Sequence, residues 1–358
     1  MNRNKWIGVG ILGIVAVVAA IYIFFVANQP KDVAINGLLG GEKIGLFQSQ
    51  EFLDTMKKKN HLNVDYRKAG SIAMAVETAQ NHNAENYDYL FPASKMAAEI
   101  YKEQGGTAVA SDIIFNTPLV LYSRKPVVDA LMTQKVVTQR EGIYYVNMKS
   151  LAALIAKGTS WESIGLPQLY GNVLVDTTDP NASNSGNMFL GLLANSINDG
   201  KVVTEDTLPQ VEETVRRIYQ EIGHMQSSSS DMFNQFLKQG VGAYPIVAGY
   251  ENQILELTRM EPDLFQQVKS DLVLLYPTPT VWADHVYVAL TENGKKGMDA
   301  LLTKEVQAMA WKNHGFRTIA AGTADTSLFP VKGVPKDITG VMPMPSYAVM
   351  QKLMQSIR

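Results

Sequence analysis

Short apolar runs alternate with stretches in which apolar residues recur every three or four positions, from Lys43 to the C-terminus. The runs are mostly rich in β-branched and aromatic residues, which favours strands, whereas the recurring spacing is typical of helices with one buried face. Regular alternation of the two predicts an α/β fold. The predicted strands are Lys43–Phe47, Leu62–Tyr66, Tyr87–Phe91, Ile113–Tyr122, Asn172–Asp176, Gly242–Ile246, Leu272–Tyr276 and Val286–Leu290.

The helical spacing marks apolar faces that we expect to be core rather than functional surface. Ahead of the first predicted strand, Gln29 to Gly41 is interpreted as a short linker. The predicted buried faces are Phe52/Leu53/Met56, Val211/Val215/Ile218/Ile222, Met232/Phe233/Phe236/Leu237 and Met298/Leu301/Leu302.

The length of the chain predicts two lobes, because about 330 residues exceed what one hydrophobic core usually serves. A linker rich in proline, glycine and serine does not separate them, which favours lobes joined by crossing strands. The extended runs Ile113–Tyr122 and Leu272–Trp282 are the candidates for these crossings. The predicted limits are 1–30 for a cytoplasmic stub and transmembrane anchor, 31–120 for the first part of lobe 1, 121–275 for lobe 2, and 276–358 for the return crossing and the second part of lobe 1.

An uncharged apolar stretch precedes this α/β region and runs from Ile7 to Ala27. At roughly 1.5 Å per residue it can cross a hydrocarbon core of roughly 30 Å. Arg3 and Lys5 come before it, so the positive-inside rule places the N-terminus in the cytoplasm and the remainder outside. A cleaved signal peptide is the alternative, but its apolar region is usually shorter. We expect a single-pass protein of the cell membrane that contacts lipid through residues 7–27.

Composition excludes several classes of function. Lysine and arginine total 32 against 34 acidic residues, and this balance, without an arginine-rich run, argues against a nucleic acid partner. The chain has no cysteine and its 5 histidines lack metal-ligand spacing, so we expect no metal site. Gly8, Gly10 and Gly13 match a dinucleotide-binding pattern, but they lie in the apolar stretch and not after a strand, so we expect no cofactor.

Turns rich in glycine, serine and asparagine lead into several predicted helices, and these turns carry the functional hypothesis. A helix N-terminus offers unpaired N–H groups and the positive end of the peptide dipole, so several such ends facing one crevice can hold an anion or polar solute. The structural alternative is helix capping, which serine and asparagine commonly provide. The candidate ligand-binding residues in these turns are Gly41, Gly70, Ser71, Ser183, Asn184, Ser185, Gly186 and Ser229.

Aromatic and polar residues in or near the strands could line the same crevice. Aromatic residues are more often core, and the carboxylates Asp176, Asp179 and Glu251 could instead favour a cationic or amine-bearing ligand. The sequence leaves both alternatives open. The further candidates are Asn116, Tyr244, Tyr250, Glu251 and Tyr276, with Trp282 as an additional aromatic residue.

Several segments, in this order, resemble the bacterial extracytoplasmic solute-binding proteins of ABC importers, which have the type 2 periplasmic-binding fold. The resemblance implies two lobes that close over a ligand, with the C-terminal segment returning to the first lobe. It also implies pocket residues at Gly70-Ser71 and at Ser183–Gly186 with Tyr244. A retained membrane helix departs from the usual anchor of the family. The segments are VDYRKAGSIAMAVE (Val64–Glu77), DTTDPNASNSGNMF (Asp176–Phe189), QGVGAYPIVAGYENQ (Gln239–Gln253), LLYPTPTVWADHVYVAL (Leu274–Leu290) and EVQAMAWKNHGFR (Glu305–Arg317).

The sequence therefore predicts a membrane-anchored solute-binding protein, not an enzyme, that captures a small polar ligand between two lobes. The resemblance slightly favours an anionic ligand and implies an ABC permease as partner. The alternative is a tethered envelope module that senses or binds other envelope proteins and has no role in transport. A hydrolase on the same scaffold would need a paired base and nucleophile, which the sequence does not reveal.

Overall fold

A computed structural model describes residues 17–18, 31–80, 86–318 and 324–358 of the chain. Over these residues, nine strands form one continuous sheet in the order β2-β1-β3-β9-β4-β8-β6-β5, with β7 also paired to β4. The strands are β1 (Val33–Leu39), β2 (Leu62–Lys68), β3 (Tyr89–Phe91), β4 (Ala110–Arg124), β5 (Val137–Arg140), β6 (Ile143–Asn147), β7 (Ile246–Tyr250), β8 (Leu272–Thr278) and β9 (Trp282–Ala289).

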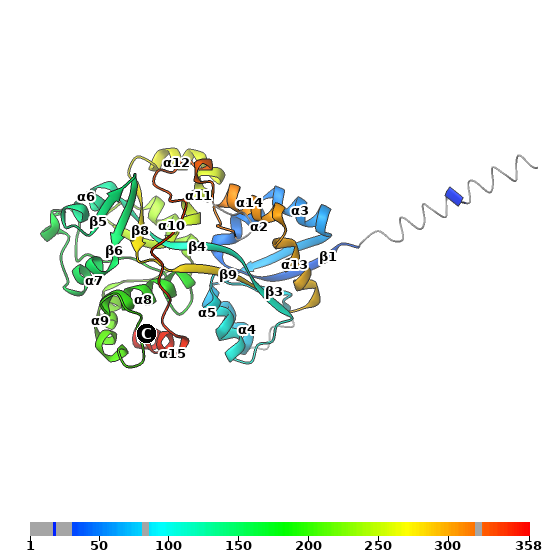
Figure 1. Cartoon of the computed structure of the whole chain (residues 1–358), viewed down its shortest axis with the longest axis horizontal. Helices are drawn as coiled ribbons and strands as arrows, with labels where there is room; N and C mark the ends of the chain where they lie inside the picture. The colour runs from blue at the N-terminus through cyan, green and yellow to red at the C-terminus, as the bar shows by residue number, and fades with distance from the viewer. Residues whose placement is uncertain (1–16, 19–30, 81–85, 319–323) are drawn as a thin grey trace, which may run out of the picture.

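Helices lie on either side of the central strands β4 and β9 (Figure 1). The predicted α/β class is therefore confirmed. The helices are η1 (Gly41–Lys43), α2 (Ile44–Gln48), α3 (Gln50–Asn60), α4 (Ser71–Gln80), α5 (Lys95–Glu103), α6 (Lys125–Thr133), α7 (Met148–Ala156), η3 (Glu162–Ile164), α8 (Asn184–Ile197), α9 (Leu208–Glu221), α10 (Ser229–Lys238), α11 (Glu251–Met260), α12 (Pro262–Val268), α13 (Glu292–Leu301), α14 (Lys304–His314), η4 (Thr326–Leu328) and α15 (Tyr347–Ser356).

Strand β4 belongs to both halves of the sheet and so joins two lobes. Its residues Ala110–Pro118 pair with β9, and from Leu119 onward it pairs instead with β7 and β8. Pro118 stands at this change of partner, where a residue without an N–H costs the ladder least. In Figure 1, β4 and β9 run between the blue and orange elements and the green ones. We call the half with β1 to β3, α2 to α5, α13 and α14 the first lobe, and the half with β5 to β8 and α6 to α10 the second lobe.

The chain crosses again between β8 and β9, since β8 pairs with β6 of the second lobe and β9 pairs with β3 of the first. The last helix then returns to the second lobe, because α15 packs against α8 and α9. The predicted domain limits 31–120, 121–275 and 276–358 remain a prediction, and they assign this last helix to lobe 1.

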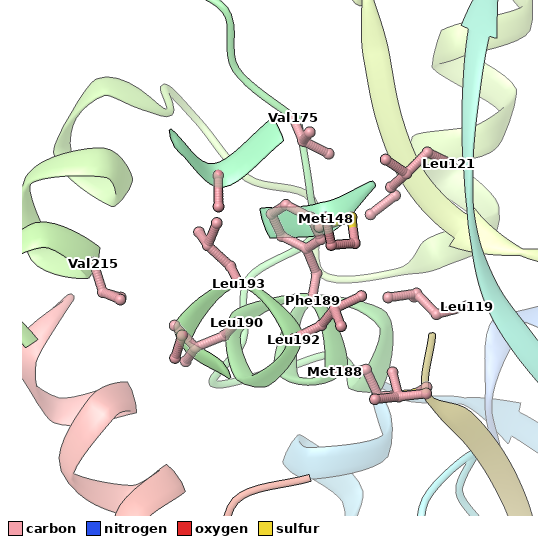
Figure 2. Packing of buried hydrophobic residues seen from close by; sticks show 14 of the residues in the cluster. Leu119, Leu121, Met148, Val175, Met188, Phe189, Leu190, Leu192, Leu193 and Val215 are labelled. Atoms are coloured by element: carbon pink, nitrogen blue, oxygen red, sulfur yellow. The ribbon is translucent and has the colours of Figure 1, made fainter. Parts of the chain in front are cut away.

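Helix α8 lies at the centre of the second lobe's core. All of its residues except Ile197 are buried, as expected for a helix that is mostly apolar around its circumference. Figure 2 shows Leu190, Leu192 and Leu193 of this helix among side chains from α7, α9 and β4. This packing fixes where the N-terminus of α8 points.

Three predicted strands and part of the predicted linker differ from the structure. The predicted strand Asn172–Asp176 forms only isolated bridges, at Asn172 and at Asp176. Lys43–Phe47 is helical, within η1 and α2, because Phe47 and Leu46 pack beside Phe52 instead of alternating across a sheet. Val33–Leu39, inside the predicted linker, forms β1 between β2 and β3. Gly242–Ile246 lies mostly before β7.

The predicted anchor at 7–27 lies outside the described residues, apart from Val17 and Val18. Among the residues that are described, none of the helices combines the length and apolar character that a membrane crossing requires.

Candidate functional site

A narrow hollow lies between the lobes, where the N-termini of η1, α4, α8 and α10 meet. Its volume of about 10 Å³ is room for about one water-sized sphere. It brings together the predicted residues Gly41, Gly70, Ser71, Ser183, Asn184, Ser229 and Tyr250, and its other lining residues are Gly40, Glu42, Ala69, Ser227 and Ser228.

The serines that precede α8 and α10 do not cap their own helices. Ser183 and Ser228 occupy the N-cap positions, yet neither side chain accepts a hydrogen bond from its helix. By contrast, Ser94 accepts from the N–H of Ala97 and caps α5, away from the hollow. Because the serine side chains do not occupy the first-turn N–H groups, the positive dipoles of α8 and α10, and those N–H groups that are not bonded elsewhere, can act on a ligand in the hollow.

The two uncapped serines bond to neighbouring hydroxyls instead. Ser183 Oγ lies 3.3 Å from Ser185 Oγ, and Ser228 Oγ lies 2.9 Å from Ser230 Oγ. A side chain at Gly41 would come within 2.6 Å of the Oγ atoms of both Ser228 and Ser230. The absence of a side chain therefore lets the start of η1 in the first lobe approach the serine hydroxyls of the second.

Asn184 connects the two lobes at the base of α8. Its Nδ2 donates to the carbonyl oxygen of Ala93 at 2.6 Å and to the hydroxyl of Tyr250 at 3.1 Å. Burial raises the pKa of Tyr250 well above its usual value, so the hydroxyl remains protonated and can itself donate. The second lobe thus contributes a neutral donor, the Tyr250 hydroxyl, to the site.

A buried ionic group lies next to the hollow, formed by Glu42, Lys43 and His285. The Lys43 ammonium pairs with the Glu42 carboxylate, contacts His285 Nδ1 at 3.2 Å and stands 4.8 Å from the centre of the Phe91 ring. Burial raises the pKa of Glu42, but Lys43 and His285 outweigh it and hold this pKa well below its usual range. Burial, with the Lys43 charge, lowers the pKa of His285 to about 4. Since Glu42 and Lys43 neutralise each other, helix ends and hydroxyls dominate the field in the hollow.

Four predicted residues lie elsewhere. Glu251 accepts hydrogen bonds from Arg317 and from the hydroxyl of Tyr276, so these two candidates form a buried ion-pair group with an arginine that sequence reasoning did not single out. Asn116 exchanges backbone hydrogen bonds with the same Arg317. Tyr244 donates to Gln235 Oε1 at 2.7 Å. The spacing of Glu251 and Arg317 along the chain carries no signal that they pair.

Ser185 and Gly186 stand behind the hollow and hold the start of α8. The Ser185 hydroxyl is 2.7 Å from Thr178 Oγ1, and the N–H of Gly186 donates to the same oxygen at 2.8 Å. A side chain at Gly186 would meet the carbonyl oxygen of Thr178 at 2.0 Å. Both residues therefore set the position of α8 through Thr178.

The hollow adjoins a groove of about 500 Å³ that shares Gly41 and Glu42 with it. Where the hollow opens into this groove, which we call its mouth, Lys68 Nζ of the first lobe donates to the Asp231 carboxylate of the second at 2.7 and 2.8 Å. Sequence reasoning missed this pair, because neither residue belongs to a motif and only the fold places the end of β2 beside α10.

A larger groove of about 620 Å³ lies between α5, α8 and the segment before α15, and methionines contribute much of its lining. We place the candidate site at the smaller hollow, because there the helix N-termini of both lobes converge. The methionines of the larger groove are Met96, Met188, Met342 and Met344.

The sequence matches no protein-family model and no curated protein. Several solved structures are nevertheless similar to the chain. The sulfate-binding protein SubI from Mycobacterium tuberculosis H37Rv has a TM-score of 0.53 and 14% identity, with 84% of this chain and 93% of that chain covered.

Two further structures show the same likeness. The periplasmic binding protein AfuA from Actinobacillus pleuropneumoniae, with fructose-6-phosphate bound, has a TM-score of 0.56 and 12% identity over 92% of this chain and 97% of that chain. The ferric binding protein from Campylobacter jejuni has a TM-score of 0.54 and 12% identity over 90% of this chain and 96% of that chain. The chain therefore has the two-lobed α/β fold of type 2 periplasmic binding proteins.

Proposed function

We propose that this protein is an extracytoplasmic solute-binding protein that captures a small oxyanion between its two lobes. The observation that carries the proposal is the convergence, in one hollow, of the helix ends of both lobes, two of them begun by serines that leave their helices uncapped. Capture is binding alone, in which no covalent bond is made or broken.

The chemistry of the lining favours an oxyanion. Helix N-terminal N–H groups and serine hydroxyls donate hydrogen bonds to anionic oxygens, and such charge-assisted bonds are stronger than neutral ones. The lining has one ionisable acid, Glu42, and its carboxylate is already paired with Lys43. A sulfate-binding protein and a binding protein with a phosphorylated sugar bound share the fold, which supports this ligand class.

Loading requires the lobes to part, since the hollow of about 10 Å³ is too small for a tetrahedral oxyanion. The backbone passes from lobe to lobe at Pro118 in β4, between β8 and β9, and again between α14 and α15. Closure by rotation about such a hinge would then bring the serines of α10 against the amides of η1.

We further propose that residues 7–27 hold the domain at the outer face of the membrane and that an ABC permease receives the ligand. The apolar, uncharged stretch after Arg3 and Lys5 supports the anchor. The test is membrane fractionation with protease added from outside. Membrane-bound protein that is digested externally is expected, whereas release into the soluble fraction contradicts the anchor.

Titration calorimetry on the full chain in detergent tests the binding function. Sulfate, phosphate and molybdate are compared with organic acids, amines and neutral sugars at one ionic strength. We expect saturable heat with at least one oxyanion and none with the sugars. Binding of amines but of no oxyanion would overturn the oxyanion assignment, and the absence of any binding would overturn solute capture.

The small size of the hollow favours one second candidate, a tethered envelope module whose cleft takes no ligand. Affinity capture of the full chain from detergent extracts separates the two functions. Recovery of a permease and its ATPase supports solute delivery. Recovery of other envelope proteins, together with the absence of binding heat in calorimetry, supports the tethered module.

A further inference from the structure

A backbone carbonyl of the second lobe caps the N-terminus of α4 in the first lobe. The carbonyl oxygen of Ala182 accepts hydrogen bonds from the N–H groups of Ile72 at 3.1 Å and Ala73 at 3.3 Å. Both amides lie in the first turn of α4, where a helix has no partner of its own for its N–H groups. These two donors of the proposed site are therefore already engaged, and their acceptor comes from the opposite lobe.

Gly70 permits this contact. A side chain at Gly70 would place its Cβ 2.3 Å from the Ala182 carbonyl oxygen, a distance that a backbone atom cannot accommodate without moving. Gly70 is not among the glycines with positive φ, so its backbone conformation is one that alanine can adopt. The missing side chain thus serves the approach of the lobes.

The carbonyl is held in place by its own turn. The N–H groups of Ala182 and Ser183 both donate to the carbonyl oxygen of Asp179, at 3.0 and 2.8 Å. The N–H of Asn181 donates to the Asp179 carboxylate at 2.8 Å. Because these bonds lie within the second lobe, the turn keeps its shape when the lobes part, and the Ala182 carbonyl is preorganised to meet α4.

We propose that the Ala182 carbonyl oxygen holds the two lobes of the ligand-free protein together. It accepts hydrogen bonds from the Ile72 and Ala73 amides of α4, at the position that an oxygen of a bound ligand takes. A ligand can enter only after this carbonyl has left the Ile72 and Ala73 amides, so ligand and carbonyl compete for the same two donors. The ligand part of this inference rests on the proposed function, whereas closure by Ala182 does not.

Two measurements on the full chain in detergent test closure without any ligand. Amide hydrogen exchange is followed at Ile72 and Ala73 in the wild type, in Gly70→Ala and in Gly240→Ala. Gly240 is the matched control, because an added Cβ there meets nothing within 4 Å. We expect exchange at both amides to be slow in the wild type and in Gly240→Ala, and to accelerate by about tenfold or more in Gly70→Ala.

The second measurement is the distance between spin labels on Lys57→Cys in the first lobe and Gln220→Cys in the second, in a chain without cysteine of its own. The Gly70→Ala protein is expected to add a population at a changed label distance. Fast exchange at both amides in the wild type, or exchange in Gly70→Ala equal to that in Gly240→Ala, would overturn the inference.

Binding kinetics separate this inference from the proposed function. If the carbonyl must leave first, the observed rate of sulfate binding levels off at the opening rate in the wild type, and the plateau rises in Gly70→Ala. A wild-type rate that grows linearly with sulfate refutes the competition although sulfate binds. Slow exchange that depends on Gly70, with no binding of sulfate or phosphate, supports closure by Ala182 and contradicts oxyanion capture.

Discussion

Serine residues at helix N-termini have two roles in this protein. Some cap their helix and others bond to neighbouring hydroxyls, and the side-chain hydrogen bond distinguishes the two. Ser94 and Ser346 accept from the third residue that follows them and so stabilise α5 and α15. Ser183 and Ser228 occupy the same position but turn toward other hydroxyls beside the hollow. Only the first kind contributes the usual capping energy.

Alanine at Ser183 or Ser228 should therefore weaken ligand binding with little change in stability. Each change removes one hydroxyl donor to an anionic oxygen, and we expect the dissociation constant for the oxyanion to rise roughly tenfold or more. Calorimetry gives the affinity, and thermal unfolding gives the stability. Asn147→Ala is the matched control, because Asn147 caps α7 away from the hollow. That variant should lose roughly 1 kcal/mol of stability and no affinity, and the opposite pattern would assign the serines to capping.

Asp176 should make stability depend on pH in the acidic range. Burial raises the pKa of Asp176 to about 6, from an ordinary value of 3.8. Between these values the native carboxyl holds its proton more tightly than the unfolded one does. Its contribution to stability is therefore present at low pH and is lost as the pH rises toward 6. Asp176→Asn removes this loss. The free energy of unfolding of the variant, relative to that of the wild type, should therefore increase by roughly 2–3 kcal/mol as the pH rises from 4 to 7.

Denaturant unfolding of both proteins at several pH values checks this expectation. The difference between the two free energies of unfolding isolates Asp176. His285, whose lowered pKa produces the opposite trend by destabilising the native state as pH falls from 6.5 toward 4, is present in both proteins and cancels. A difference that stays constant with pH would contradict the assignment.

Some residues of the candidate site could be predicted from the sequence, and others could not. Gly70, Ser71, Ser183 and Asn184 could be predicted because turn chemistry before an apolar helix is a local pattern. The Ala182 contact could not, because alanine has no side-chain function and the contact depends on how closely two lobes approach.

At the scale of elements, α8 connects the core of the second lobe to the candidate site. Its first residue, Asn184, lines the hollow, and Leu190, Leu192 and Leu193 lie deep in the packed cluster of Figure 2. Because packing is dense, the position of the helix start depends on the side chains further along the helix.

Leu192→Ala should destabilise the protein by roughly 2–5 kcal/mol, through lost burial and the cavity that remains. Denaturant unfolding measures the change. Leu302, which the sequence predicted to be buried, is 37% exposed in the structure and is the control. Leu302→Ala should cost on the order of 1 kcal/mol, clearly less than Leu192→Ala. Equal effects of the two substitutions would show that α8 is not the packing centre we describe.

Helices were easier to predict than strands in this chain. The spacing of Val211, Val215 and Ile218 identified α9, since every third or fourth residue faces the core. The run Lys43–Phe47 was wrongly predicted to be a strand, because so short an apolar segment does not distinguish the helical period from the strand period. β1 was missed because its asparagine and glycine, Asn36 and Gly37, resemble linker composition.

At the scale of the whole molecule, two strand crossings and the return of the chain to α15 connect the lobes, and polar contacts beside the hollow hold them together. Asn184 reaches Ala93, Ala182 reaches α4, and Lys68 reaches Asp231. The first two close the interior of the hollow. The third lies at its mouth, where both side chains keep contact with solvent.

Removing the charge at the mouth should shift the protein toward open lobes by a modest amount. The Lys68–Asp231 pair is partly exposed, and pairs of this kind contribute at most about 1 kcal/mol. Lys68→Gln should therefore raise the open population by up to roughly fivefold at low salt, and the difference from wild type should shrink as salt is added. The label distance between the lobes, measured in the ligand-free protein, reports this population.

Lys58→Gln provides the matched control for the pair at the mouth. Lys58 bonds Asp54 at 2.8 Å on the same helix, so its loss removes an exposed ion pair without touching the interface between the lobes. This variant should leave the label distance unchanged. If both lysine substitutions open the lobes equally, the effect comes from net charge and not from the contact. If neither does, the buried contacts of Ala182 and Asn184 hold the lobes together without help from the surface.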